Sequence, residues 1–396
     1  MIGLSLLFIL ASFAVSVPAT LLARSIGRHL NALDGAGVSG QVKAPARRVP
    51  NTGGVGIFMG VLLPIGGGMV LIWLGKVGAI AEQVPAFARH LDGLREMVPK
   101  GFVLLGCAGV LHVVGLIDDR RPLGARPKLL MMLIAATVAV VWTDSRLLTL
   151  LDANVGGSWA SVAITVVWIV VITNAFNFLD NMDGLAGGVA AICAACFLTT
   201  TLVGPTPQWF VAAMFAAVLG SILGFLVFNF PFVSRRKLSD GERVGGASIF
   251  MGDGGSLVIG FLLAILSVRI TYVTSTSGST PYHVLFVPII ILAIPLYDFY
   301  SVVLIRVLQK KSPFVGDLQH FSHRLAGHGL SQRAAVLVIC GCAGVTGIGA
   351  IAMPRLEPWQ GALVGVQTLM VLGVLAAYEW RRTPGGAQRA DRGRPR

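Results

Sequence analysis

The sequence predicts an all-α, polytopic membrane protein with about eleven transmembrane helices. Of its 396 residues, 55% are hydrophobic and only 12% are charged, and the mean hydropathy is +0.79. A soluble globular protein carries about 25% charged residues, so this composition excludes a soluble fold. The apolar residues are also gathered into runs of about 20, the helix length that crosses the hydrocarbon core of a bilayer. In lipid, such a run has to satisfy its own backbone hydrogen bonds, which a helix does.

Eleven such runs follow one another along the chain, and each predicts one membrane-spanning helix. They cover residues 2–22, 53–75, 101–117, 128–143, 159–178, 184–203, 208–229, 255–273, 284–305, 333–353 and 360–380. We expect residues 1–380 to form a single integral membrane catalytic domain. Residues 381–396 are basic and almost devoid of large apolar side chains, which predicts a disordered cytoplasmic tail.

The distribution of positive charge predicts the orientation of these helices. No Lys or Arg precedes the first run, unlike in a signal peptide, so we expect a retained span with the N-terminus outside. With that orientation, 24 of the 31 Lys and Arg residues fall in inner segments. Cytoplasmic loops collect Lys and Arg, which places the C-terminus inside as well. Topology and attraction to anionic lipid account for the net charge of +13, without nucleic acid as a partner.

Acidic residues indicate where chemistry takes place. Seven of the 18 Asp and Glu residues lie within the runs or beside their inner ends, where a carboxylate is costly unless it is paired or used. These seven are Asp118, Asp119, Asp180, Asp183, Asp253, Asp298 and Asp317. The sequence therefore predicts a functional site at the inner face.

The first motif closes the third run. Asp118 and Asp119 are followed by Arg120 and Arg121 and, a few residues later, by Lys128. This arrangement sets acids beside cations that bind phosphate, and one acid could accept a proton from a phosphate nucleophile or help to hold a metal. A loop held by salt bridges is the alternative interpretation.

The second motif lies at the end of the fifth run. Asn174, Asn177, Asp180 and Asp183 recur every three residues, which places all four on or near one face of a helix. Amides and carboxylates that converge in this way can bind a nucleoside or complete the ligand shell of a metal. The neighbouring residues are apolar, which disfavours a merely solvated helix end.

The third motif is the glycine-rich stretch 250–256, in which Asp253 stands just before a helix. A carboxylate there suits Mg²⁺, which takes one or two carboxylates together with substrate phosphates. Backbone N–H groups at the start of the next helix could face a phosphate. An ordinary helix cap by Asp253 is the alternative.

The fourth motif, residues 317–325, brings together His320, His323 and Arg324. These side chains can contact a diphosphate or act as bases. A zinc site is the alternative, and the lack of a nearby cysteine disfavours it.

Together and in this order, the four motifs resemble the polyprenyl-phosphate N-acetylhexosamine-1-phosphate transferase family, of glycosyltransferase family 4 type. The resemblance extends from Pro50-x-x-Gly53-Gly54 to Leu325. It implies that a lipid phosphate attacks the sugar-linked phosphate of a UDP-sugar, giving a lipid-diphospho-sugar and UMP. It also implies a Mg²⁺ cofactor, with Mn²⁺ as an alternative.

The resemblance implies a role for each motif residue. Catalytic roles fall to Asp118, Asp119, Asp180 and Asp183, and metal binding falls to Asp253 and Asp180. Contacts to the substrates fall to Lys128, Asn174, Asn177, Phe250, His320, His323 and Arg324, with Phe250 stacking on uracil. The partners implied are a UDP-sugar, polyprenyl phosphate and the lipid bilayer, and a homodimer stays open.

The last motif distinguishes branches of the family. H-x-x-H-R-L at 320–325 resembles the branch that initiates O-antigen, enterobacterial common antigen and teichoic acid linkage units, whereas the muramoyl-pentapeptide branch carries adjacent histidines. We therefore expect transfer of GlcNAc-1-phosphate to undecaprenyl phosphate at the cytoplasmic face of a bacterial inner membrane. Two departures from the pattern are Ser322, where the branch often has histidine, and an extra basic stretch at 234–246.

Two alternative functions stay open from the sequence. One is the phospho-N-acetylmuramoyl-pentapeptide transferase of peptidoglycan synthesis. The other is a secondary transporter, since acids within a membrane also mark ion pathways. Transporter sites lie near the middle of the bilayer on broken helices, whereas only Asp298 of the seven acids lies within a run.

Overall fold

The structure is a computed structural model of the chain. It describes residues 1–33, 49–78, 82, 85–149, 152–204, 206–230, 235–237, 243–270, 282–312 and 319–379. The predicted tail 381–396, part of the basic stretch 234–246 and Asp317 lie outside the described residues.

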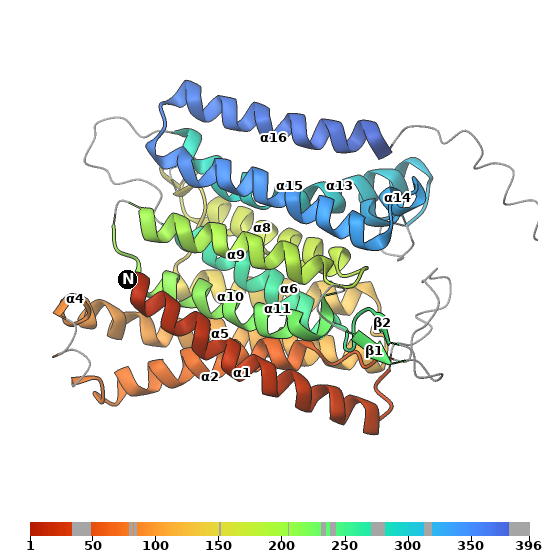
Figure 1. Ribbon diagram of the computed structural model, residues 1–396. Helices are drawn as coiled ribbons and strands as arrows, with labels where there is room; N and C mark the ends of the chain where they lie inside the picture. Colours follow the sequence, from red (N-terminus) through yellow and green to blue (C-terminus); the bar gives the residue numbers. More distant parts are fainter. Residues whose placement is uncertain are drawn as a thin grey trace, which may run out of the picture.

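Long helices make up most of the described chain (Figure 1). They are α1 Ile2–His29, α2 Gly54–Trp73, α5 Leu91–Arg120, α6 Ala125–Thr143, α8 Trp159–Leu179, α9 Leu185–Val203, α10 Trp209–Asn229, α11 Asp253–Arg269, α13 Ala293–Leu308, α15 Gln332–Ala352 and α16 Pro358–Glu379. Shorter elements connect them, namely α4 Pro85–Ala88, α7 Asp152–Val155, η2 Tyr282–Phe286, α12 Val287–Ile291, α14 Phe321–Gly327 and η3 Met353–Arg355. One antiparallel hairpin pairs β1 Arg235–Lys237 with β2 Arg243–Gly245.

The protein is therefore a multi-span helical membrane protein. Within the described residues, nine helices are long and apolar enough to cross a membrane, or up to ten with the bent pair Tyr282–Ile291 and Ala293–Leu308. Each of the eleven predicted runs coincides with a helix or with this pair. The run 255–273 corresponds to α11, which has only 17 residues. The exact count of eleven and the orientation stay predictions.

The ninth predicted run, 284–305, is not one straight helix. Its two parts meet at Leu292 and are bent by 71°. Pro295 has no N–H to donate to the carbonyl of Ile291, four residues earlier, and a proline at such a position breaks or kinks a helix. The thiol of Cys193 in α9 donates to this Ile291 carbonyl at 3.3 Å. A neighbouring helix thus satisfies the group that the break sets free.

The core of the bundle lies around α10 and α11. α10 packs against α1, α2 and α9, and α11 packs against α5 and α8. Every residue of α11 from Gly254 to Ser267 is buried. Small residues let these backbones approach closely: a Cβ added at Gly220 of α10 would stand 2.2 Å from the carbonyl oxygen of Ile9 in α1.

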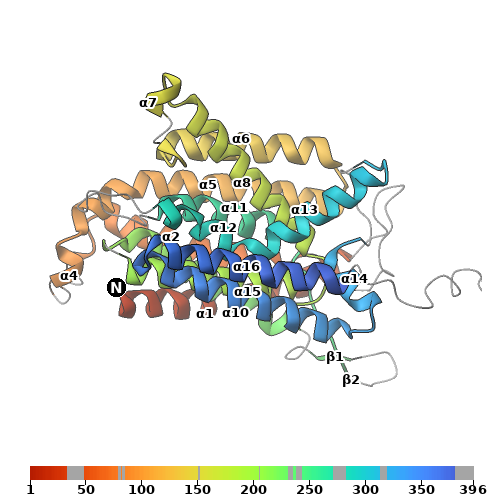
Figure 2. The same ribbon diagram turned by 90° about the horizontal axis from the view of Figure 1, so that it is seen from above.

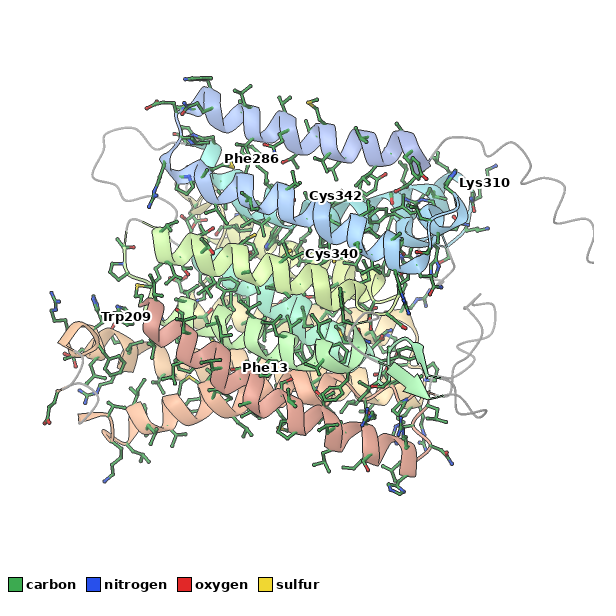
Figure 3. All side chains as sticks on the ribbon, viewed as in Figure 1. Phe13, Trp209, Phe286, Lys310, Cys340 and Cys342 are labelled. Atoms are coloured by element: carbon green, nitrogen blue, oxygen red, sulfur yellow. The ribbon has the colours of Figure 1, made fainter. Side chains whose placement is uncertain are left out.

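The chain directs its polar motifs to one end of the bundle. Figures 1 and 2 show α14 and the β1–β2 hairpin at the same end, opposite α4. α5 and α8 finish at this end, and α6 and α11 begin there. Lys310, after α13, lies at the same end (Figure 3). Segments that are far apart in the sequence are thereby brought together.

Candidate active site

A glycine-rich turn before α11 is the frame of the site. Its residues Phe250 and Met251 pair with the segment before α2 through three backbone hydrogen bonds. Phe250 N donates to the Pro50 carbonyl, and the N–H groups of Gly53 and Gly54 donate to the carbonyls of Phe250 and Met251, each at 2.8 Å. Gly53 and Gly54 of the Pro50-x-x-Gly53-Gly54 motif therefore hold in place the turn that carries Asp253.

Lys128 joins two of the predicted motifs. Its ammonium group lies 2.9 Å from Asp118 Oδ2 at the end of α5 and 2.6 Å from Asp253 Oδ2 at the start of α11. The side chains of Lys128, Asp118 and Asp253 are 19%, 13% and 24% exposed. A cation thus sits between two carboxylates from different helices, in a position that solvent still reaches.

Asp119 has a different environment from its neighbour Asp118. Its Oδ1 accepts hydrogen bonds from Asn51 Nδ2 at 2.8 Å and from the backbone N–H of Asp253 at 3.0 Å. Its Oδ2 accepts from the N–H of Gly254 at 3.3 Å. Asp119 therefore caps the start of α11 from another helix. Asp253 does not cap its own helix, since the N-cap position belongs to Gly252.

Glycine at 252 is needed for this arrangement. Its backbone has φ +70° and ψ 172°, a region that is essentially restricted to glycine. A Cβ there would also stand 2.4 Å from Asp119 Oδ2 and 2.7 Å from Asn51 Oδ1. His112 braces the same turn from α5, with its Nδ1 2.7 Å from the Gly254 carbonyl oxygen and its ring stacked on Phe58. This is the satisfied buried histidine that is more common than a ligand.

The four polar residues of the motif at the end of α8, Asn174, Asn177, Asp180 and Asp183, make contacts with different parts of the structure. Asn177 Nδ2 donates to Asp253 Oδ1 at 2.8 Å and to Ser256 Oγ at 3.0 Å. Asp180 ends α8 and interacts electrostatically with Asp119. Asp183 accepts from the N–H of Ala247 at 2.9 Å, which fixes the loop before the glycine-rich turn.

Asn174 is turned away from this cluster. Its amide donates to the Val170 carbonyl at 2.9 Å, within α8, and to Met132 Sδ at 3.2 Å. The structure thus joins Asn177 with Asp253 and does not join Asn174 with them. The side chain of Phe250 is half-buried, and its stacking on uracil stays a prediction.

The histidine motif is anchored by Asp298, one of the seven acids that the sequence singles out but a member of none of the four motifs. Asp298 is fully buried, and its carboxylate accepts from the Phe321 N–H at 2.8 Å and contacts His320 Nδ1 at 3.0 Å. The His320 ring also meets the edge of Phe178 in α8 at 5.6 Å between centroids. The signal in the sequence was that Asp298 is a lone acid inside an apolar run.

Arg324 connects α14 to two long helices. Its Nε and Nη2 donate to Glu379 Oε2 at 2.8 and 2.6 Å, and Nη2 also donates to Ser301 Oγ at 2.9 Å. Glu379 is buried at the end of α16. Ser322 Oγ donates to Asn181 Oδ1, beyond α8, at 2.5 Å. Contact of Arg324 with a diphosphate stays a prediction.

His323 lies outside the membrane-spanning helices and is half-buried. Burial lowers its pKa below the usual value, the nearby His320 lowers it further, and Asp298 opposes both. The imidazole is therefore neutral near pH 7 and can accept as well as donate a hydrogen bond.

The Mg²⁺ that the resemblance implies can be compared with the side chains present in the acid cluster. Among the described residues, no three His, Cys, Asp or Glu side chains are grouped closely enough to hold a metal by themselves. Asp118 and Asp253 nevertheless face each other across Lys128. Mg²⁺ commonly takes one or two carboxylates and fills its other positions with water and phosphate, so the residues present fit this ion.

Comparison with known proteins identifies relatives over most of the chain. The family model described as glycosyl transferase family 4 matches residues 101–271. A probable undecaprenyl-phosphate N-acetylglucosaminyl 1-phosphate transferase of Bacillus subtilis is 29% identical over 347 residues, which cover 85% of this chain and 84% of that protein.

Two further relatives have similar descriptions. The decaprenyl-phosphate N-acetylglucosaminephosphotransferase of Mycobacterium tuberculosis is 32% identical over 331 residues, covering 78% of this chain and 76% of that protein. The undecaprenyl-phosphate alpha-N-acetylglucosaminyl 1-phosphate transferase of Escherichia coli K12 is 29% identical over 265 residues, covering 64% of this chain and 66% of that protein.

Proposed function

Since the chain belongs to glycosyl transferase family 4, we propose that it transfers N-acetylglucosamine-1-phosphate from UDP-N-acetylglucosamine to undecaprenyl phosphate. The phosphate oxygen of the lipid attacks the sugar-linked phosphorus, the bond to the UMP oxygen breaks, and UMP leaves. The product is a lipid-diphospho-sugar on which a cell-envelope polysaccharide starts. The descriptions of the three relatives support this acceptor class and this sugar.

The observation that carries the proposal is the contact of Lys128 with both Asp118 and Asp253. Phosphoryl transfer requires positioning and neutralisation of charge more than covalent catalysis. A lysine and two carboxylates from three helices, open to solvent at one end of the bundle, provide the means for both. Lys128 would bind the phosphate that is transferred, because an ammonium group favours the charge that develops there.

Asp118 and Asp253 are the residues that we propose to hold Mg²⁺, or Mn²⁺ in its place. The ion, when bound, supplies neutralisation of charge on the diphosphate. Asn177 holds Asp253 Oδ1 at 2.8 Å, so it orients this carboxylate. Asp180, at the end of α8, contributes further negative charge beside Asp119.

The two adjacent acids have separate roles in this proposal. Asp118 faces Lys128 and Asp253, and it is therefore the acid beside the reacting phosphates. Both oxygens of Asp119 are already engaged with Asn51 and with the start of α11, so Asp119 positions the turn. A phosphate monoester loses its second proton at a pKa of about 6, so the lipid nucleophile is largely deprotonated at pH 7 and requires little help from a base.

The donor nucleotide would lie between the turn at 250–256 and α14. We propose that Phe250 stacks on uracil and that Asn177 and Asp183 line the nucleotide side. His320, held by Asp298, and the neutral His323 would contact the sugar diphosphate. Asp298 is thus a positioning residue for His320.

We further propose the topology in which all of this chemistry takes place on the cytoplasmic side of the bacterial inner membrane. α11 serves as the eighth of eleven spans: its 17 residues extend for about 25 Å, and it is buried between α5 and α8. The N-terminus then lies outside, and the end of the bundle that carries α14 lies inside.

The test is release of UMP by the purified protein. UDP-N-acetylglucosamine is supplied with and without undecaprenyl phosphate and with and without Mg²⁺, beside a panel of other UDP-N-acetylhexosamines. The proposal predicts release that needs the lipid and the metal and is fastest with the N-acetylglucosamine donor. Absence of release with every donor, or release that ignores the lipid, would contradict it.

A further inference from the structure

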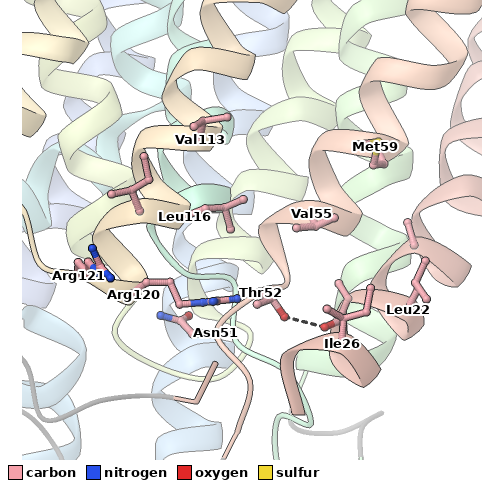
Figure 4. Close-up of a pocket in the computed structure, with 13 residues that line it drawn as sticks. Leu22, Ile26, Asn51, Thr52, Val55, Met59, Val113, Leu116, Arg120 and Arg121 are labelled. Atoms are coloured by element: carbon pink, nitrogen blue, oxygen red, sulfur yellow. Dashed lines mark hydrogen bonds between the residues drawn. The ribbon is translucent and has the colours of Figure 1, made fainter. Parts of the chain in front are cut away.

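A groove outside the acid cluster lies between α1, α2 and α5 (Figure 4). Its volume is about 720 Å³, and its walls are apolar side chains from all three helices. They include Leu22, Ile26, Val55, Met59, Val113 and Leu116. An apolar groove of this size on a membrane protein accommodates hydrocarbon chains.

The end of the groove nearest the acid cluster is polar and positively charged. Asn51, Thr52, Arg120 and Arg121 line it, and Figure 4 shows Arg120 extending beside Asn51 and Thr52. Both arginines are exposed, and neither guanidinium group is ion-paired with a described residue. By contrast, Lys128 is paired with two carboxylates of the cluster.

The acids beside these arginines are already engaged elsewhere. Asp118 accepts from Lys128 and from the N–H of Leu123, and Asp119 accepts from Asn51 and from the start of α11. The two guanidinium groups therefore present positive charge at the end of an apolar groove. This pattern is complementary to an anionic headgroup on apolar chains.

The groove is separate from the reacting groups. Lys128 and Asp253 are not among the described residues that line it. Asn51 is bonded to Asp119, and Thr52 Oγ1 donates to the Ala23 carbonyl at 2.9 Å, the dashed contact in Figure 4. Asn51 thus lines the groove and also contacts the acid cluster through Asp119. A lipid whose phosphate lies on Arg120 and Arg121 would lie beside the cluster, since none of Asp118, Lys128 and Asp253 is among the described residues that line the groove.

We propose that this groove binds one anionic phospholipid of the bilayer, with its acyl chains between α1, α2 and α5 and its phosphodiester on Arg120 and Arg121. The bound lipid contacts the last turn of α5, which carries Asp118 and Asp119. If the proposed transfer reaction holds, the fraction of anionic phospholipid in the membrane regulates the reaction. Binding itself does not depend on that reaction.

The test measures lipid binding to the purified full chain in a neutral detergent. Phosphatidylglycerol or phosphatidylcholine is titrated at equal mole fraction, and bound lipid is counted by native mass spectrometry. The wild type is expected to retain one phosphatidylglycerol in preference to phosphatidylcholine. The double variant Arg120→Gln, Arg121→Gln is expected to bind phosphatidylglycerol about 25-fold more weakly, the effect of two basic residues at an anionic headgroup.

Two further variants serve as controls. Lys310→Gln with Lys311→Gln removes the same charge from exposed positions after α13, at the same end of the bundle, and should leave the bound phosphatidylglycerol in place. Met59→Trp fills the groove without a change of charge and should displace the lipid, even if the arginine variant does not fold. Thermal unfolding of each variant checks that it is folded.

Three results would overturn the proposal. The first is equal retention of both phospholipids by the wild type, and the second is equal loss in the Lys310 and Lys311 variant. The third is displacement of phosphatidylglycerol by equimolar undecaprenyl phosphate, which would assign the groove to the acceptor. None of these measurements requires UMP release, so they stand apart from the test of the transfer reaction.

Discussion

Two glycines start their helices with nearly the same backbone but different surroundings. Gly252, before α11, has φ +70° and ψ 172°, and Gly124, before α6, has φ +83° and ψ 172°. A Cβ at 252 would stand 2.4 Å from Asp119 Oδ2, whereas a Cβ at 124 meets nothing within 4 Å. An alanine would therefore be strained to a similar extent at both positions, and only at 252 would its Cβ also clash with Asp119.

We expect Gly252→Ala and Gly124→Ala to lose similar stability to backbone strain, roughly 1–3 kcal/mol each. Gly252→Ala should in addition reduce kcat for UMP release at least tenfold below Gly124→Ala, because it displaces Asp119 and with it the start of α11. Thermal unfolding and kcat of the two purified variants provide the measurement. Equal kcat values would mean that Asp119 does not position Asp253.

His323 predicts a dependence of stability on pH. Its pKa is lowered in the folded chain, first by burial and then by His320, whereas the same imidazole in the unfolded chain has a pKa of about 6.5. As the pH falls through that value, the unfolded chain therefore binds more protons than the folded chain. Stability therefore falls as the pH drops through that value. We expect the unfolding temperature of the wild type to fall more steeply between pH 7 and pH 5 than that of His323→Gln.

The control for this effect is His29→Gln, at an exposed position at the end of α1, which should follow the wild type. If His323→Gln also followed the wild type over the whole pH range, the environment of His323 would not be the one described.

Sequence patterns identified the residues of the acid cluster but not the residues that orient them. Asp118, Lys128 and Asp253 stand in dense motifs and are joined in the structure. Asn51 and Glu379 were not identified, and Asp298 was noted only as an acid within an apolar run, because each acts through a contact with a distant segment, of which the sequence gives little sign. Asn174 shows the opposite case, since its spacing matched the motif while its amide bonds within α8.

At the scale of elements, α14 is held by an ion pair to a helix at the far end of the chain. Arg324 donates twice to Glu379 Oε2, and the exposed fractions of the two side chains are 16% and 0%. Removal of one partner leaves a largely buried charge without its counter-charge, whereas replacement of both by apolar groups of similar size is often tolerated.

This arrangement predicts how the variants differ. Glu379→Gln should lower the unfolding temperature by several degrees and raise KM for the UDP-sugar, because α14 carries His320 and His323. The double variant Arg324→Met, Glu379→Met should recover the stability. If it also recovers kcat, Arg324 only fastens α14; if it is stable and inactive, Arg324 contacts the substrate as the sequence predicted.

Apolar runs located the helices well but not their ends or breaks. α1 and α5 are longer than the predicted runs, with α5 beginning at Leu91 instead of residue 101. Hydropathy does not detect the part of a helix that continues into polar sequence. The break at Leu292 depends on Pro295 and on the thiol of Cys193 from another helix, and a single run of apolar residues contains no sign of that partner.

At the scale of the whole molecule, the bundle has two distinct ends. The end with α14 carries the acid cluster, Arg120, Arg121 and Lys310, and the segment after α2 with Lys76 lies at the opposite end. Positive charge at the first end agrees with a cytoplasmic location.

The orientation can be measured with single cysteines in a background without the five native ones. Lys76→Cys, an exposed position, should react with a membrane-impermeant maleimide in sealed cells. Lys310→Cys should react only after the membrane is made permeable. The reverse pattern would place the acid cluster outside, where no supply of UDP-sugar from the cytoplasm reaches it.

The most direct test of the central claim is UMP release by purified Asp253→Asn, beside Asp92→Asn as a matched control. Asp92 is 94% exposed and pairs only with Arg95 among the described residues, so its variant should keep the wild-type rate. Asp253→Asn keeps the shape of the side chain but removes the negative charge that faces Lys128. We expect at least a 100-fold lower kcat with unchanged thermal unfolding. A wild-type rate in Asp253→Asn would show that the transfer does not take place at the Asp118, Lys128 and Asp253 cluster.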